Sequence, residues 1–415
     1  MRKVEGYNNK HNKKLFRVFV LTLGIILAVG LPALFIVKTV KDGGKASSGL
    51  SLGGWESIPE AAMAENAAIT DEESAKKAAI IYEGDEDYTH VIGTASDDTV
   101  TIGFAGDILF DSEYAVGNAF KMNGYNAQGV IGDSLLEKMQ AVDIMMVNNE
   151  FPYSYGGAPL AGKTYTFRAD PVSAQILGQM GVDLVGLANN HAYDYGQQAL
   201  LDTFSTLNDH GISYVGAGSN IDEASHPVYY ITSNGMKVAI ICATQIERLN
   251  TPDTKGATET SPGVFRCLDD SLLLDRVREA REKNAYVVVF IHWGTESTTE
   301  IDYLQEQQAR EIVDAGANII IGAHPHILQK IDYINGVPVV YSLGNYIFNS
   351  KTQDTGMVVV TLHTNGSTNL QFVPAIQSGC SVNEATGSEY SRILNSIAGM
   401  SSHINIDGNG YISQK

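Results

Sequence analysis

Seven polar side chains that can bind metals or exchange protons each follow closely on a short apolar run. They are two carboxylates, one amide and four imidazoles, namely Asp107, Glu150, Asn190, His191, His292, His324 and His326. This mixture of oxygen and nitrogen donors suits divalent metal ions of hard to borderline character. Each residue alone also has a structural explanation, as a turn acid, a solvated end or a core histidine. Because the same position recurs after five apolar runs, the pattern favours a common site.

Two stretches carry the most informative spacing. Asn190 and His191 are adjacent, so a single turn offers an amide oxygen as a metal ligand and an imidazole as an acid or base. The alternative is a capped turn, in which Asn189 adopts a left-handed conformation and Asn190 caps the next helix. In His324-Pro325-His326 the proline fixes the backbone, so both imidazoles could approach neighbouring metals from a bend. The alternative there is one ligand and one orienting partner.

The apolar runs before these residues predict buried strands. The strands are expected at residues 100–105, 144–147, 182–187, 286–291 and 318–321. Helices are expected between them, at residues 170–181, 197–209, 271–283 and 303–314. In an α/β sheet, ligands bind beyond the carboxyl ends of the strands, which is where the polar residues fall.

Asn-Gly pairs separate other apolar runs at residues 234–235, 335–336 and 365–366, and each pair predicts a β-hairpin. Strand–helix units mixed with hairpins indicate an α/β fold, a layered sandwich of two mixed sheets with helices outside. The folded domain is expected over residues 98–378. Residues 379–415 are polar and weakly patterned, so a loosely packed C-terminal tail is expected there.

The N-terminal part has a different composition. Residues 18–37 carry no charge and are long enough to span a hydrocarbon core of roughly 30 Å. Residues 1–17 are basic, which predicts a cytoplasmic tail, a single transmembrane anchor and an extracytoplasmic C-terminal domain. A cleaved signal peptide is the alternative, but the run is long and lacks a clear small-residue cleavage site. Residues 38–97 are rich in Gly, Ser, Ala and Glu, which predicts a flexible acidic spacer.

Net charge and cysteine content argue against two classes of protein, those that bind nucleic acids and those held together by a disulfide framework. The chain carries a formal charge of −19, of which residues 1–41 contribute +7, so the remainder carries −26. So acidic a body argues against nucleic-acid binding, which needs clustered Lys and Arg. Three cysteines are too few for a disulfide framework, although Cys267 and Cys380 could pair. Cys242 lies in an apolar run and is expected to be a core thiol.

Six motifs in order resemble the CapA family of poly-γ-glutamate capsule biosynthesis proteins. They are Gly106-Asp107, Asn148-Asn149-Glu150, the stretch 187–196, His292-Trp293-Gly294-Thr295-Glu296, Gly322-Ala323-His324-Pro325-His326 and the stretch 342–348. The resemblance covers roughly residues 99–376, and its Asn-Asn-His and His-Pro-His elements are the most specific. The family looks like a branch of the calcineurin-like metallophosphoesterases, which implies a four-layer α/β/β/α sandwich around two metals.

The resemblance also implies roles for the candidate residues. Asp107 and His326 would bind the first metal, and Glu150 would bridge the two metals. The second metal would be held by Asn190, His292 and His324. Divalent Mn, Fe or Zn would fit these donors. Two such ions would suit hydrolysis of a phosphate ester best and could also serve attack on an amide.

Three departures from the related motifs bear on catalysis. Leu109 stands where the superfamily has a histidine ligand, Ala192 follows His191 where it has an acid, and Asn149 replaces the usual leucine. The first metal would then be weakly held. His191 would be the general acid near the leaving group, and Asp194 could orient it in place of the missing acid.

The expected anchor at residues 18–37 and the resemblance to the CapA family together predict a membrane-anchored, extracytoplasmic protein. It would act in capsule or cell-surface polymer biosynthesis and contain a divalent-metal hydrolase centre. The expected partners are an anionic polymer or its precursor, and capsule synthase subunits. Lys163, Arg168 and Arg248 could attract the polymer, although the solvated surface is the favoured explanation of all three. Two alternatives remain: a non-catalytic polymer-binding or export factor with a degenerate metal site, and a phosphoesterase acting on cell-wall phosphopolymers.

Overall fold

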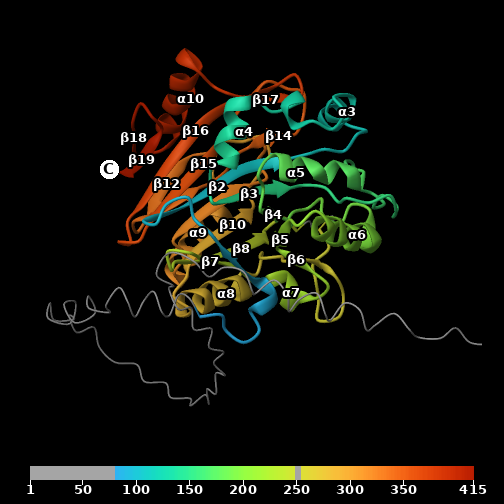
Figure 1. Cartoon of the computed structure of the whole chain (residues 1–415), viewed down its shortest axis with the longest axis horizontal. Helices are drawn as coiled ribbons and strands as arrows, with labels where there is room; N and C mark the ends of the chain where they lie inside the picture. The colour runs from blue at the N-terminus through green and yellow to red at the C-terminus, as the bar shows by residue number, and fades with distance from the viewer. Residues whose placement is uncertain (1–79, 248–253) are drawn as a thin grey trace, which may run out of the picture. The chain divides into compact units, whose positions relative to one another are not determined.

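Two mixed β-sheets form the centre of the computed structural model, which describes residues 80–247 and 254–415 (Figure 1). The predicted anchor at residues 18–37, most of the predicted spacer and Arg248 lie outside the described residues. Within the described ranges, no helix combines the length and the apolar character needed to cross a membrane.

The larger sheet has ten strands and contains the first three strands predicted to precede polar residues. Its strands β2 (Thr99–Ile108), β3 (Ile144–Asn149), β4 (Leu184–Gly186) and β5 (Ser213–Val215) run parallel to one another. β15 (Gln353–His363) pairs antiparallel with β2 and forms the predicted hairpin with β16 (Thr368–Ser378). The short strand β14 (Asn345–Ile347) also pairs with β2.

The smaller sheet has seven strands in the order β1-β7-β8-β10-β11-β13-β12. The predicted hairpins join β7 (Val228–Thr232) to β8 (Lys237–Thr244), and β12 (Ile331–Ile334) to β13 (Val337–Val340). β10 (Tyr286–His292) and β11 (Ile319–Ala323) run parallel at its centre, as the sequence predicts. A separate pair consists of β6 (Ala217–Gly218) and β9 (Gly263–Val264).

Helices cover the outer faces of both sheets. Against the ten-stranded sheet pack α3 (Ala115–Met122), α4 (Asp133–Gln140), α5 (Gln175–Gln179) and α6 (Gly196–Asp209). Against the seven-stranded sheet pack α7 (Ile221–Ser225), α8 (Ser271–Glu282) and α9 (Tyr303–Ala315). Short 3-10 turns lie at η2 (Glu86–Tyr88), η3 (Ala127–Gly129) and η4 (Pro171–Ala174).

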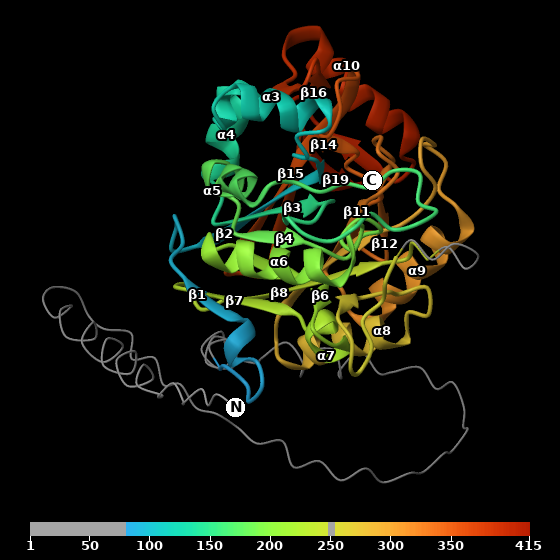
Figure 2. The same cartoon turned by 90° about the vertical axis from the view of Figure 1, so that its right-hand side faces the viewer.

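The layers are held together by three apolar clusters. Phe104 and Met146 of the ten-stranded sheet meet Ile240 and Phe290 of the seven-stranded sheet in a fully buried central cluster. Two further clusters fill the space between each sheet and its helices. In Figure 2, α3 and α4 lie at the upper left and α7 and α8 at the bottom, with strands of both sheets between them. The predicted α/β class, with two mixed sheets and helices outside, is confirmed.

The folded body begins earlier than the sequence predicts. β1 (Thr89–Ile92), inside the predicted flexible spacer, pairs in parallel with β7 at the edge of the seven-stranded sheet. Just before it, Asp85 is buried and accepts a 2.9 Å hydrogen bond from Lys283. The acidic composition of this segment concealed the strand, because an edge strand is stabilised by pairing with a distant segment rather than by its own pattern.

The predicted loosely packed tail is also folded. Residues 379–415 contain β17 (Ser381–Glu384), α10 (Gly387–Met400), β18 (Ile404–Ile406) and β19 (Tyr411–Gln414), drawn in red beside β16 in Figure 1. α10 buries Ile393, Leu394 and Ile397 in the central cluster. These three residues form the apolar face of the helix. The helix was not predicted because the rest of the tail is mostly polar.

Candidate metal centre

The candidate residues converge because each lies at the carboxyl end of a parallel strand. Asp107 lies near the end of β2 and Glu150 directly follows β3, both in the ten-stranded sheet. Asn190 lies in the loop between β4 and α6 of the same sheet. His292 ends β10, and the His-Pro-His segment follows β11, both in the seven-stranded sheet. The two sheets therefore supply different halves of one site.

The backbone of the His-Pro-His segment is strained. His324 and His326 have φ angles of 97° and 60°, in a region that side chains other than glycine rarely occupy. Pro325 between them restricts the segment further. Conformations of this kind persist where surrounding contacts hold them, and they concentrate at functional sites. The rings of His324 and His326 lie 5.8 Å apart between centroids.

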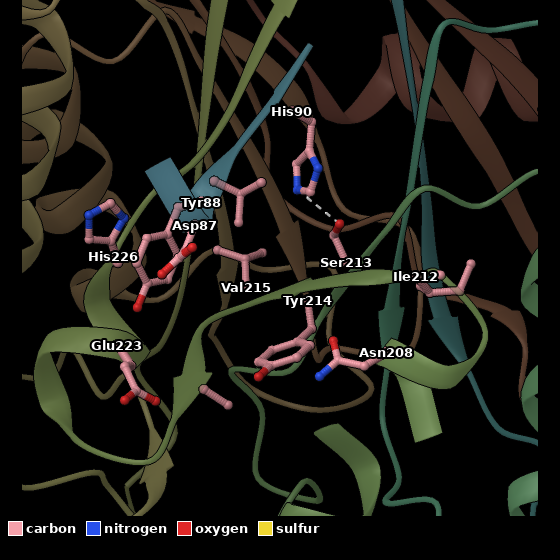
Figure 3. Close-up of a pocket in the computed structure, with 13 residues that line it drawn as sticks. Asp87, Tyr88, His90, Asn208, Ile212, Ser213, Tyr214, Val215, Glu223 and His226 are labelled. Carbon is pink, nitrogen blue, oxygen red and sulfur yellow. Dashed lines mark hydrogen bonds between the residues drawn. The ribbon is translucent and has the colours of Figure 1, made fainter. Parts of the chain in front are cut away.

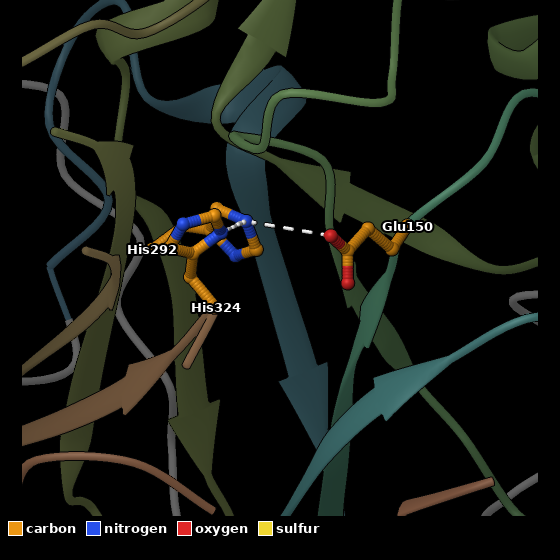
Figure 4. A group of neighbouring side chains, drawn as sticks. All are labelled: Glu150, His292 and His324. Atoms are coloured by element: carbon orange, nitrogen blue, oxygen red, sulfur yellow. Dashed lines mark hydrogen bonds and ion pairs between the residues drawn. The ribbon is translucent and has the colours of Figure 1, made fainter. Parts of the chain in front are cut away.

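One group of donors gathers around His292. Its Nε2 atom lies 2.8 Å from Oδ1 of Asn190, 3.1 Å from Nδ1 of His324 and 3.5 Å from Oε1 of Glu150. Figure 4 shows the Glu150 carboxylate facing the two imidazole rings. Burial, followed by the neighbouring histidine His324, holds the pKa of His292 well below its ordinary value. A neutral imidazole is the form that binds a metal.

A second group shares Glu150 with the first. Asp107, Glu150 and His326 place one possible ligand atom each within 4.8 Å of one another, as do Glu150, His292 and His324. Nδ1 of His326 lies 3.1 Å from Oδ2 of Asp107 and 2.9 Å from Oδ1 of Asn345. Burial alone would lower the pKa of His326, but the carboxylates of Glu150 and Asp107 raise it to about 9.

Glu150 provides the test of whether a cation fits. Its side chain is fully buried, and neither carboxylate oxygen has a hydrogen-bond partner among the described residues. Burial, reinforced by the charge of Asp107, raises its pKa well above the ordinary value. A buried carboxylate without hydrogen bonds costs several kcal/mol, on the order of the penalty for a buried ion that is poorly compensated. Imidazole and carboxylate donors on both sides of it make a divalent cation the partner that fits.

His191 is held by its own set of contacts. Its Nδ1 atom lies 2.7 Å from Oδ2 of Asp194, and the same oxygen accepts a 2.8 Å hydrogen bond from the backbone of Phe167. The ring of Phe167 covers the imidazole at 4.2 Å between centroids. Nε2 of His191 lies 3.9 Å from Oε1 of Glu150. Burial lowers the pKa of His191, although Asp194 opposes that shift.

Lys163 departs from its favoured explanation as a solvated side chain. Its side chain is 7% exposed, and Nζ lies 2.5 Å from Oδ1 of Asp194 and also contacts the backbone oxygen of Asn190. Arg168 lies 4.2 Å above the ring of Tyr195 and donates to the oxygen of Gly156. Lys163 therefore belongs to the site and binds the carboxylate that orients His191.

Several site residues were not predicted. Nδ2 of Asn148 donates to Oδ1 of Asp107 at 2.7 Å and lies 3.3 Å from Nδ1 of His292. Its Oδ1 accepts from Asn189, whose own Oδ1 accepts from the backbone of His191. The available signal was the position of Asn148 at the end of a buried strand, two residues before Glu150.

Two of the three departures from the motifs that the sequence resembles, Leu109 and Ala192, are buried apolar residues. Leu109 and Ala192 are each 1% exposed and belong to the cluster between the ten-stranded sheet and its helices. Neither offers a ligand atom. All three cysteines are free, so Cys267 and Cys380 do not pair, and Cys242 is buried in the core as expected.

A cavity of about 330 Å³ lies apart from these groups, where β1 meets β5 and α7. Figure 3 shows Tyr88, Tyr214 and Glu223 on its walls and the 3.0 Å contact between His90 and Ser213. None of the residues that line it belongs to the metal-ligand groups. The cavity is therefore a separate feature of the fold.

Known proteins resemble this chain over most of the folded body. The family described as bacterial capsule synthesis protein PGA_cap matches residues 101–350, more than half of the 415 residues. The PGA biosynthesis protein CapA of Bacillus subtilis (strain 168) is 31% identical over 296 residues, covering 69% of this chain and 74% of that protein.

Two further relatives are matched over shorter stretches. The capsule biosynthesis protein CapA of Bacillus anthracis is 34% identical over 226 residues, 53% of this chain and 54% of that protein. A probable polyglutamine synthesis accessory protein of Mycobacterium tuberculosis (strain ATCC 25618 / H37Rv) is 25% identical over 213 residues, 50% and 56% respectively. This chain thus spans just over half the length of these two relatives. The predicted resemblance is confirmed, and the chain belongs to the CapA family of bacterial capsule synthesis proteins.

Proposed function

We propose that this chain is a membrane-anchored, extracytoplasmic hydrolase that depends on divalent metal ions and acts in the biosynthesis of an anionic capsule polymer of the poly-γ-glutamate type. Residues 18–37 would anchor it, and the described body would lie outside the cell. The body would then be a variant of the metallophosphatase-like sandwich, with an anionic polymer or its precursor as substrate.

One observation carries the catalytic part of this proposal. Glu150 is fully buried, lacks hydrogen-bond partners for both oxygens among the described residues, and belongs to two groups of possible ligands at once. A purely structural carboxylate would be expected to find donors. The position is the one that a carboxylate shared by two cations requires.

The chain's own residues divide the work in the proposed reaction. Asp107, Glu150 and His326 would hold one ion, and Glu150, Asn190, His292 and His324 the other. Such ions act as Lewis acids and lower the pKa of a nearby water molecule. His191, fixed by Asp194 at Nδ1, would present Nε2 to the leaving group and donate its proton there. Phe167 would exclude water from one face of that imidazole.

Metal content and hydrolysis test the proposal directly. The full chain is purified in detergent, and the metal per chain is measured by elemental analysis before and after addition of Mn²⁺, Zn²⁺ and Fe²⁺. The loaded protein is then incubated with poly-γ-glutamate and, separately, with a phosphodiester. New amine ends or released phosphate monoester that disappear with a chelator would support it. A chain that binds no metal under any condition would refute it.

A second function is favoured by Leu109. A buried leucine stands where the resemblance implies a histidine ligand. Loss of a ligand is what a non-catalytic polymer-binding or export factor with a degenerate metal site would show. That function predicts binding of the polymer without metal and without cleavage, which equilibrium dialysis in the presence of a chelator measures. A phosphoesterase of cell-wall phosphopolymers is distinguished by the phosphodiester arm of the same assay.

A further inference from the structure

We propose that Glu296 is a ligand of the metal held by Asp107, Glu150 and His326, in the place that Leu109 leaves without a donor. The inference rests on the proposed metal-dependent function and concerns a residue to which the related motifs give no role. It starts from the geometry of the turn that follows β10.

This turn is fastened to the His-Pro-His segment at both of its ends. The backbone nitrogen of Trp293 donates to the oxygen of Ala323 at 3.1 Å, and that of Ser297 donates to the oxygen of Pro325 at 2.9 Å. Glu296 lies between these two attachment points. Its carboxylate is therefore carried by the same backbone that places His324 and His326.

The turn has little freedom to move away. Gly294 has a φ angle of 83°, and a Cβ atom there would lie 2.5 Å from the side chain of Gln305. The indole of Trp293 is buried and donates to the oxygen of Tyr341 at 2.8 Å. Ser297 also has a positive φ angle, of 60°. These constraints fix where the Glu296 side chain begins.

The carboxylate reaches the ligand atoms. Glu296, His324 and His326 each place one possible ligand atom within 4.8 Å of the others. This group shares His326 with the group of Asp107 and Glu150, and His324 with the group of Glu150 and His292. The unpartnered, fully buried oxygens of Glu150 mark the same region as the place for a cation.

The two proposed ions differ in how many donors the fold already supplies. The ion at His292 would have four: Glu150, Asn190, His292 and His324. The other would have three, because Leu109 offers none. A carboxylate is a suitable fourth donor for a divalent ion. We therefore assign Glu296 to the ion with the smaller set.

Its exposure gives this ligand a distinct property. Asp107 and Glu150 are fully buried, whereas Glu296 is exposed to solvent. An anionic substrate could therefore displace it from the ion without disturbing the core. Glu296 would hold the weaker ion between turnovers and yield its position when substrate arrives.

Metal titration of a matched pair of variants tests this assignment. Glu296→Gln removes the proposed ligand, and Glu300→Gln removes an exposed carboxylate of the same loop that belongs to none of the ligand groups. Full-length proteins are stripped of metal and titrated with Mn²⁺ by calorimetry, and bound Mn²⁺ is counted by electron paramagnetic resonance. Melting temperatures confirm that both variants fold.

Two Mn²⁺ ions are expected to bind to the wild type and to Glu300→Gln. Glu296→Gln should keep one ion and bind the other at least about tenfold more weakly, which corresponds to a loss of roughly 1.4 kcal/mol in binding free energy. Identical titrations of the two variants, or loss of both ions in Glu296→Gln, would overturn the assignment while leaving the proposed function intact. Absence of Mn²⁺ binding in the wild type would instead refute the proposed function itself.

Discussion

Oδ1 of Asp194 lies 2.5 Å from Nζ of Lys163, and Oδ2 of the same carboxylate lies 2.7 Å from Nδ1 of His191. One fully buried acid therefore neutralises a buried cation and fixes a histidine at the same time. The resemblance described in the sequence analysis would place an acid directly after the histidine, where this chain has Ala192. Here the acid lies three residues after the histidine, within the loop that leads to α6.

Replacing Asp194 by Asn should therefore affect both stability and turnover. Buried Lys163 would lose the carboxylate that it contacts at 2.5 Å, which costs about 3 kcal/mol or more, and the amide would no longer fix the tautomer of His191. Urea unfolding measures the first effect and the rate of hydrolysis the second. Asp222→Asn, at a side chain that is 93% exposed, is the control and should leave both unchanged. Unaltered unfolding of Asp194→Asn would contradict the buried ion pair.

Metal loss and loss of turnover should separate at neighbouring residues. His191→Ala is expected to retain metal and to lose about 10²–10⁴-fold in rate, because only proton transfer is removed. Asn190→Ala and His324→Ala should lose metal, because each removes a donor next to His292. Elemental analysis of all three proteins gives the comparison. Equal metal loss in the three would show that His191 is itself a ligand.

The metal-free protein should become less stable as pH rises from neutrality. The pKa of His326 is raised from 6.5 to about 9, so its stabilisation is complete below pH 6.5 and is lost as pH rises through 9. Glu150, whose pKa is also raised, acts in the same direction. In the presence of a chelator, the free energy of unfolding of the wild type should fall by up to about 3 kcal/mol relative to that of His326→Gln as pH rises from 6.5 through 9.

Unfolding in urea at several pH values measures this difference. His363→Gln changes a histidine on β15, away from the centre, and should follow the wild-type profile. Adding Mn²⁺ should flatten the profile, since bound metal keeps Glu150 ionised and His326 neutral. A wild-type profile parallel to that of His326→Gln would exclude the charged imidazole.

Gly106 should be intolerant of substitution. A Cβ atom there would lie 2.0 Å from the backbone oxygen of Gly344, which accepts the 3.0 Å hydrogen bond from Asp107. Gly106→Ala is expected to cost about 2–3 kcal/mol and to weaken metal binding by displacing Asp107. Gly178→Ala is the control, because no heavy atom lies within 4 Å of its added Cβ. It should stabilise α5 slightly, by roughly 0.5–1 kcal/mol.

Membrane anchoring predicts a further outcome in bacterial cells. The full chain should stay in the membrane pellet after alkaline extraction, and protease added outside should digest its body. Leu27→Arg places a charge at the centre of the apolar run, at a cost of about 3 kcal/mol, and should release part of the protein. Leu27→Ile should behave as wild type. Protection of the body from external protease would reverse the proposed orientation.

Local signals explain which parts of the fold could be predicted. The Asn-Gly turns and the apolar runs carry their structure in a few neighbouring residues, so β10 and β11 were placed within a residue or two and the turn between β7 and β8 was identified. β1 was missed because its register depends on β7, far along the chain. α3 and α4 fill the loop between two strands and were likewise not predicted.

In the site, too, features set by neighbouring residues could be predicted, whereas contacts between distant segments could not. Strand ends identified the ligand candidates, because carboxyl ends of parallel strands meet without any knowledge of side-chain packing. The contacts of Lys163 and Asn148 in the site were not predicted, because the carboxylates they contact lie 31 and 41 residues away in sequence. Glu296 was quoted only as part of a motif, since its closeness to the imidazoles depends on two backbone contacts between separate loops.

The candidate ligands come from two different sheets, and this division would affect how fast the protein is degraded. Asp107 and His326 are 219 residues apart, so an ion between them would act as a reversible cross-link that closes most of the folded chain into one loop. While the ion is present, separating the two sheets would require breaking its bonds to the ligands of one of them. In surroundings depleted of metal the cross-link would be lost, and proteases would find the protein more often in an open form. Its lifetime would then follow the supply of the metal it binds.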